Sequence, residues 1–308
     1  MAKEKQKKLS DEDILKILDL LEEYGENQWL IYWKKHLAVL DNDKIINDKE
    51  KTLRYLLLRV LINQQAQIDI VRALITELYK EFNDLLLFKP YVISELDIVK
   101  VFKKICGERG SKLYRVGFLG GIKPISLFTY RFKAYEGFIK WLEKNNITFK
   151  DFMINELINK SPRKLFDKLK KHEILSIGWV GNDPKACRMY INWILFLCKN
   201  IWNISQINLY DSFMIVDGHV GKIFCRTGLL DEVFYESKRP YIIEASKMRS
   251  KIENLVFIYK KIPFYVDNGA FFIYSNGYCL DIEPNCNNCI LYIICKKYIK
   301  WTAYRRFI

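Results

Sequence analysis

Apolar residues recur at intervals of three and four along most of the chain, which is the spacing of one face of an α-helix. One stripe consists of Leu53, Leu56, Leu57, Val60 and Leu61, and a second consists of Val71, Leu74, Ile75 and Leu78. Strict alternation, which would indicate β-strands, is short and scattered. The pattern therefore predicts an all-α protein.

The spacing also predicts where helices begin and end. We expect a charged leader with helices over residues 14–24 and 29–40, followed by a packed run of helices over 52–175. The segment 113–132 contains three glycines and Pro124, so it is predicted to be a loop or a sharp turn.

A helix, a glycine-containing turn and a second helix are predicted over residues 161–199. Ser161-Pro162 is an N-cap followed by proline at the first helical position, and Asn182-Asp183-Pro184 repeats this signal before Lys185. Between them lies Ile177-Gly-Trp-Val-Gly181. Such a turn can present backbone N–H groups to a phosphate. An ordinary helical hairpin is the alternative interpretation.

Charge adds a class of partner to this picture. The 308 residues include 50 Lys and Arg and 36 Asp and Glu, so the net charge is +14. A polyanion, with nucleic acid first, is the expected partner. About two domains are expected at this length. No apolar run is long enough to span a bilayer, and residues 1–8 are lysine-rich, so we expect a soluble intracellular protein without a membrane partner.

The cysteines separate into two groups. Four lie scattered among apolar neighbours and are interpreted as buried small side chains: Cys106, Cys187, Cys198 and Cys225. The other four fall close together in the order C-x6-C-x2-C-x5-C: Cys279, Cys286, Cys289 and Cys295. Four thiolates at this uneven spacing favour a [4Fe–4S] cluster. Zinc is the alternative, although zinc sites usually pair two C-x2-C motifs.

The four-cysteine spacing resembles the cluster loop of the endonuclease III branch of the helix-hairpin-helix DNA glycosylases. Three more segments are similar to that family, in the family's order: Leu58–Gln65, Ile177–Lys185 and Val216–Val220. Lys185 and Asp217 are 32 positions apart, and this interval resembles the archaeal 8-oxoguanine glycosylases.

The resemblance implies roles for individual residues. Lys185 would be the catalytic nucleophile and Asp217 the essential carboxylate, with His219 a structural companion. DNA contacts would come from the hairpin, from the end of the helix that contains Leu58–Gln65 and from the C-terminal basic stretch. The residues concerned are Gly178, Trp179, Gly181, Asn182, Gln64, Gln65, Lys296 and Lys297. Trp179 would either stack on an extruded base or simply pack, and Gln64 and Gln65 would be either a wedge in the duplex or ordinary polar residues at a helix end.

The implied architecture is a two-lobed helix-hairpin-helix fold with a C-terminal cluster loop. One lobe would comprise residues 52–190, with the hairpin unit at 162–199, and the other residues 1–51 and 191–308. The implied activity is that of a monomeric, bifunctional DNA glycosylase and AP lyase of base excision repair. Its substrate would be damaged double-stranded DNA, with 8-oxoguanine slightly favoured over oxidised pyrimidines.

Three alternatives to the implied activity remain open, and the first also follows from the resemblance, since Gln64-Gln65 is similar to the alkylpurine branch of the family. The first is a monofunctional glycosylase for mismatched or alkylated bases that uses water activated by Asp217. The second is a non-catalytic iron–sulfur protein that binds damaged DNA. The third is a zinc-containing nucleic-acid-binding module.

Overall fold

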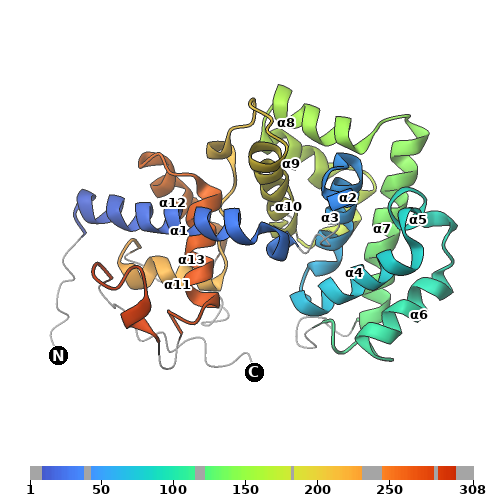
Figure 1. Ribbon diagram of the computed structural model, residues 1–308, viewed down its shortest axis with the longest axis horizontal. Coiled ribbons are helices and arrows are strands. Elements are labelled where there is room, and N and C mark those ends of the chain that lie inside the picture. The colour runs from blue at the N-terminus through green and yellow to red at the C-terminus, as the bar shows by residue number, and fades with distance from the viewer. Residues whose placement is uncertain are drawn as a thin grey trace. The chain divides into compact units, whose positions relative to one another are not determined.

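The computed structural model describes residues 9–37, 43–114, 122–181, 184–230, 245–280 and 284–295, and these ranges are mainly helical (Figure 1). They contain no β-strand, and Ala66 and Tyr114 form one isolated antiparallel bridge. The all-α prediction is confirmed for this part of the chain. None of the described helices is both long and apolar enough to cross a membrane.

The α-helices are α1 (Asp11–Leu37), α2 (Asp43–Ile46), α3 (Lys49–Asn63), α4 (Ile68–Phe82), α5 (Asp84–Phe88), α6 (Glu95–Cys106), α7 (Pro124–Lys144), α8 (Glu156–Asn159), α9 (Pro162–Lys171), α10 (Lys185–Phe196), α11 (Gly218–Thr227), α12 (Ala245–Ile258) and α13 (Pro263–Ser275). Short 3-10 turns are η1 (Pro90–Val92), η4 (Leu175–Gly178), η6 (Leu209–Asp211) and η7 (Cys286–Asn288). The π-helical turns are η3 (Asp151–Asn155) and η5 (Leu197–Ile201).

The chain divides into two compact units. Unit 1 consists of Met1–Trp33 and Asn208–Ile308, and unit 2 of Lys34–Ile207. Residues 34–51 and 191–207 therefore belong to unit 2, whereas the sequence analysis placed them in the other lobe. The indole Nε1 of Trp202 donates to the carbonyl oxygen of Ile46 at 3.1 Å, which joins these two segments.

Unit 2 is built around α3. This helix is buried from Thr52 to Ile62 and packs against α4, α7 and α10. A helix that is buried on nearly all sides occupies the centre of its unit, and most of the side chains between Leu53 and Ile62 are apolar. Both apolar stripes expected from the spacing are buried, the first on α3 and the second on the face of α4. The four scattered cysteines are buried as predicted.

Unit 1 contains a close contact between α1 and α13. A Cβ atom on Gly25 would lie 1.9 Å from the Tyr265 carbonyl oxygen, and one on Gly269 would lie 1.9 Å from the Leu21 carbonyl oxygen. Only glycine permits backbones to approach so closely. The two helices expected over 14–24 and 29–40 are in fact one continuous helix, α1, because Gly25 serves this packing and does not end the helix.

The loop predicted over residues 113–132 is wrong for its second half. Helix α7 begins at Pro124 and continues to Lys144. Proline lacks an N–H group and has a fixed φ, both of which suit the first turn of a helix. The glycines that suggested a loop lie in 115–121, outside the described residues.

His172 follows the last residue of α9 and is nearly buried. Its Nδ1 accepts hydrogen bonds from the backbone N–H groups of Ile174 and Leu175 at 3.2 and 3.4 Å. The rings of Phe138 and Trp141 meet the imidazole edge to face, with centroids 4.9 and 4.6 Å away. Because Nδ1 is an acceptor, the neutral imidazole carries its hydrogen on Nε2.

Unit 2 should lose stability in mild acid because of His172. Burial lowers the pKa of His172, Glu173 opposes this shift and the charge of Lys168 adds to it. The unfolded chain therefore binds the proton first, so stability is complete above about pH 6.5 and falls as the pH decreases below that value, by up to about 1.4 kcal/mol per pH unit.

Urea unfolding at pH 8 to 5 would measure this loss. His172→Asn retains an acceptor but does not titrate, so its unfolding free energy should depend less on pH in this range. Equal pH slopes for the two proteins would contradict the prediction.

Candidate functional site

The segment from α9 to α10 folds as a helix, a turn and a helix. Ser161 caps α9, with its Oγ accepting from the backbone N–H of Lys164 at 3.2 Å. Gly178 ends the 3-10 turn η4 and is buried, since a Cβ atom there would lie 2.9 Å from a Leu61 methyl group and 3.0 Å from Ala134. Gly181 is exposed and has a φ of +77°, which favours glycine. The two glycines of the turn thus serve different purposes.

Gln64, the residue that follows α3, ties this turn in place. Its Nε2 donates to the carbonyl oxygen of Gly178 at 2.7 Å, and its Oε1 accepts from the backbone N–H of Val180 at 2.8 Å. Nε2 also donates to the carbonyl oxygen of Leu61 at 3.0 Å. The Gln64 side chain is buried, so its amide forms hydrogen bonds within unit 2.

Gln65 differs from its neighbour. It is exposed and has a φ of +60°, an uncommon conformation for a non-glycine residue. The Nη2 of Arg131 lies 3.3 Å from its Oε1, and the Nη1 of the same guanidinium donates to the carbonyl oxygen of Gln64. The guanidinium thus supports the strained end of α3, where the helix dipole favours a cation.

Arg131 was missed by the sequence analysis. Its side chain is 1% exposed and its Cζ lies 5.3 Å from the centroid of the Tyr114 ring. The signal was present in the sequence, because Arg131 lies among the buried apolar residues of α7 beside Phe128 and Phe132. An arginine in such a position indicates a partner in the interior.

Trp179 is largely buried within unit 2. Its side chain is 8% exposed, and its Nε1 donates to the carbonyl oxygen of Leu169 at 3.1 Å. These contacts favour packing over stacking on an extruded base, the two roles considered for this residue. Trp179 closes the turn back onto α9.

Lys185 is the first residue of α10 and is exposed. It therefore lies at the positive end of the helix dipole. The next three residues, Ala186 to Arg188, are buried and anchor the first turn. The Cζ of Arg188 lies 4.9 Å from the centroid of the Phe166 ring of α9, which joins the two helices of the hairpin.

Asp217 is the N-cap of α11 in unit 1. Its Oδ1 accepts from the backbone N–H groups of His219 and Val220 at 2.9 and 3.0 Å, and the residue is only partly buried. The N-cap interpretation of this aspartate is confirmed. Lys185 lies in unit 2 and Asp217 in unit 1.

His219 and Lys222 attach α11 to α13 through one aromatic ring. The imidazole of His219 stacks on the ring of Tyr274 with centroids 3.6 Å apart and an interplanar angle of 18°. The Nζ of Lys222 lies 4.8 Å from the centroid of the same ring, and Lys222 is fully buried. These contacts favour the structural role expected for His219.

The four clustered cysteines all lie in unit 1 and are partly buried. Burial raises the pKa of the Cys289 thiol to about 11, and the other three clustered thiols contribute to this rise, so all three lie within electrostatic range of Cys289. Within the described ranges, no three His, Cys, Asp or Glu side chains are arranged to hold a metal ion.

Arg226 connects the last turn of α11 to the cysteines. Its Nη1 donates to the carbonyl oxygen of Cys279 at 2.9 Å and lies 3.1 Å from the Sγ of that residue. The Sγ of Cys295 lies 3.6 Å from the Arg226 carbonyl oxygen. The helix that Asp217 caps is therefore bonded at its other end to the cysteine segment.

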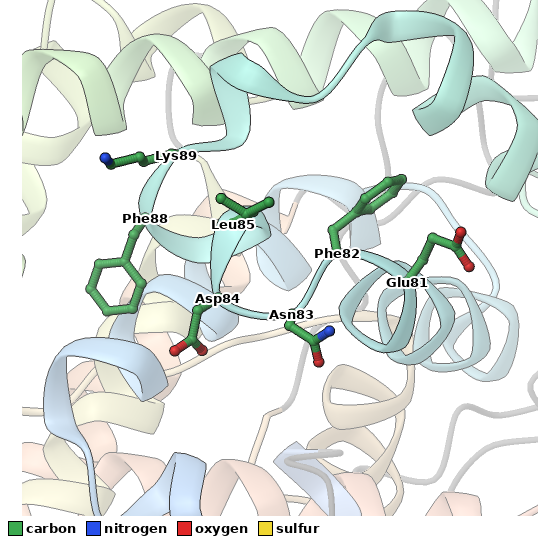
Figure 2. Close-up of a pocket in the computed structure, with 7 residues that line it drawn as sticks. All are labelled: Glu81, Phe82, Asn83, Asp84, Leu85, Phe88 and Lys89. Atoms are coloured by element: carbon green, nitrogen blue, oxygen red, sulfur yellow. The ribbon is translucent and has the colours of Figure 1, made fainter.

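Three predicted DNA contacts, Asn182, Lys296 and Lys297, lie outside the described residues. A shallow hollow of about 510 Å³ lies elsewhere in unit 2, at the junction of α4 and α5. In Figure 2 the side chains of Phe82 and Leu85 lie on one side of this junction, and those of Asn83 and Asp84 on the other. None of the predicted site residues lines this hollow.

The chain was compared with models of protein families, with curated proteins and with solved structures, and none of them matches it.

Gln64 and Gln65 provide a matched test of the hairpin contact. Gln64→Leu should lower the unfolding free energy by about 2–4 kcal/mol, because it leaves the buried carbonyl of Gly178 and the partly buried N–H of Val180 without their side-chain partner. Gln65→Ala should change it by about 1 kcal/mol or less, since that side chain is exposed. Urea unfolding of both variants measures the difference, and equal losses would contradict the role assigned to Gln64.

Proposed function

We propose that this protein is a bifunctional DNA glycosylase with AP lyase activity. It would remove an oxidised base from double-stranded DNA and then nick the strand. The observation that carries the proposal is the exposed lysine at the first position of α10, directly after a glycine turn that is bonded to the core through Gln64. A glycine turn followed by an exposed lysine is suited to bind a phosphate and attack the neighbouring sugar.

The hairpin supports sequence-independent DNA binding. Gly181 is exposed with open space where a side chain would be, so a phosphate can approach its backbone closely. Lys185 adds a positive charge at the same helix N-terminus. Gln65, exposed on the end of α3, would occupy the space left when a nucleotide is extruded.

The proposed chemistry begins with base flipping, because the glycosidic bond is inaccessible inside a duplex. Neutral Lys185 would attack C1′, and the bond to the base would break with its electron pair remaining on the base. The C1′–O4′ bond would then break, with its electron pair and a proton going to O4′, and the open sugar would be joined to Lys185 as a Schiff base. The Schiff base acidifies C2′–H, and loss of that proton would expel the 3′-phosphate with the C3′–O electron pair, which nicks the strand. The carboxylate of Asp217 would stabilise positive charge on the sugar and accept a proton from the lysine ammonium.

The residues of unit 1 support a [4Fe–4S] cluster as the cofactor. Cys279, Cys286, Cys289 and Cys295 would hold it as thiolates, and Arg226, close to the Sγ of Cys279, would offset part of their negative charge. Such a cluster would crosslink residues 279–295 to one another, and Arg226 would join this segment to α11. Removal of a base needs no electron transfer, so we assign the cluster a structural role.

8-Oxoguanine is the proposed first substrate, on the strength of the Lys185–Asp217 interval alone, with oxidised pyrimidines next. The assay for this proposal incubates the full chain with duplexes that contain 8-oxoguanine or thymine glycol, each with the opposite base varied, in the presence of borohydride. Reduction of a Schiff base should crosslink the protein to DNA. Lys185→Ala should abolish the crosslink, whereas Lys100→Ala, which changes an exposed lysine on α6, should retain it.

The variant Asp217→Asn distinguishes the two roles of this residue, because it removes the carboxylate but keeps a side chain that can cap α11. Asparagine caps helices as well as aspartate, so stability should change little, whereas base release should fall by about 100-fold or more. Base release without a crosslink would indicate the monofunctional alternative. Tight binding without base release would indicate a damage-binding protein, and either result would contradict the proposal.

The cofactor is tested by colour and metal content. Protein purified without air should be brown, with a broad absorbance at about 400 nm and about four irons per chain. Cys286→Ser should lose both signals, whereas Cys198→Ser, which changes a buried core cysteine, should retain them. Zinc in place of iron would overturn the assignment.

A further inference from the structure

Arg59 of α3 lies in the interior of unit 2 without enough hydrogen-bond acceptors. Its side chain is fully buried, and its Nη2 donates to the carbonyl oxygen of His36 at 2.8 Å. Its Cζ lies 4.9 Å from the centroid of the Trp193 ring. Within the described part of the chain, its buried Nε and Nη1 have no hydrogen-bond partner.

A second arginine stands near this one. Arg72 of α4 is close enough for its charge to lower the pKa of Arg59, although burial is the main cause of that shift, which reaches about 9. The Nη1 of Arg72 lies 3.2 Å from the exposed carboxylate of Asp69, whereas its Nε is buried without a partner among the described residues. Three guanidinium nitrogens of the pair are therefore buried and unpartnered in this part of the chain.

Among the described residues, no carboxylate compensates the charge of Arg59. The titratable groups that act on it there are Tyr55 and Arg72, and one of these is itself a cation. A buried charge is normally paired, and a buried donor is normally bonded. The contact with Trp193 offsets only part of the free-energy cost of burying the guanidinium, since a ring face accepts no conventional hydrogen bond.

We propose that Arg59 and Arg72 form a binding site for a small oxyanion of the phosphate or sulfate class. Such an ion supplies both the missing negative charge and several acceptor oxygens. The unpartnered donors belong to two guanidinium groups on the packed helices α3 and α4, and we assign both groups to this one site. The side chain of Arg72 is 27% exposed and provides the route of entry. The site is independent of the proposed repair activity.

The test measures thermal unfolding of the full chain in increasing inorganic phosphate, with ionic strength held constant by sodium chloride. The midpoint of the wild-type protein should rise by about 3 °C or more at saturation. Arg72→Gln should lose most of this rise. Arg163→Gln, which removes the same charge from an exposed position on α9, should retain it.

Arg59→Met gives the second comparison, because methionine fills similar space without a charge. In buffer that contains only chloride, this variant should be at least as stable as the wild type, and in phosphate the order should reverse. If Arg72→Gln and Arg163→Gln lose the same part of the rise in phosphate, phosphate is attracted only by the overall positive charge of the protein. That result would overturn the proposal. The proposal also fails if phosphate and chloride have the same effect on the unfolding midpoint. It fails as well if a short DNA duplex raises the midpoint in an Arg72-dependent way and inorganic phosphate does not.

Discussion

The side-chain amide of Gln64 joins the end of α3 to the turn that precedes α10. It bonds to backbone groups on both sides of Trp179, so the turn cannot shift along α3 without breaking two hydrogen bonds, one buried and one partly buried. The ring of Trp179 and the Cα of Gly178 then fill the space between α9, α3 and α7.

Local signals in the sequence predicted most of the helices of unit 2. Ser161 caps α9 and the apolar stripe of α4 is buried, because capping and helical periodicity depend on residues a few positions apart. Gly25 misled the prediction because its function is contact with α13, which lies far away in sequence. The candidate site shows the same contrast between local signals and long-range contacts. Asp217 is recognisable as a cap from its neighbours, whereas the use of Gln64 for the hairpin depends on a contact across more than a hundred residues.

The positive charge excess of the chain has two different locations. Exposed lysines such as Lys185 can attract a polyanion, but Arg59, Arg131 and Lys222 are buried and cannot reach a duplex in this state. Arg131 bonds to the carbonyl oxygens at the end of α3, and Lys222 lies against Tyr274. Part of the net charge thus stabilises the interior, so the charge available for DNA is smaller than the composition suggests.

The division of the chain has a consequence for the order of folding. Unit 2 is one continuous segment, Lys34–Ile207, whereas unit 1 is made of two segments separated by the whole of unit 2. During synthesis, unit 2 can fold as soon as its own residues have left the ribosome. The apolar face of α1 up to Trp33 has to wait for α11 and α13, and its contact at Gly25 forms late because closing so long a loop is slow. Until then α1 exposes the apolar side chains of Ile17, Leu18 and Leu21, which are buried in the folded unit.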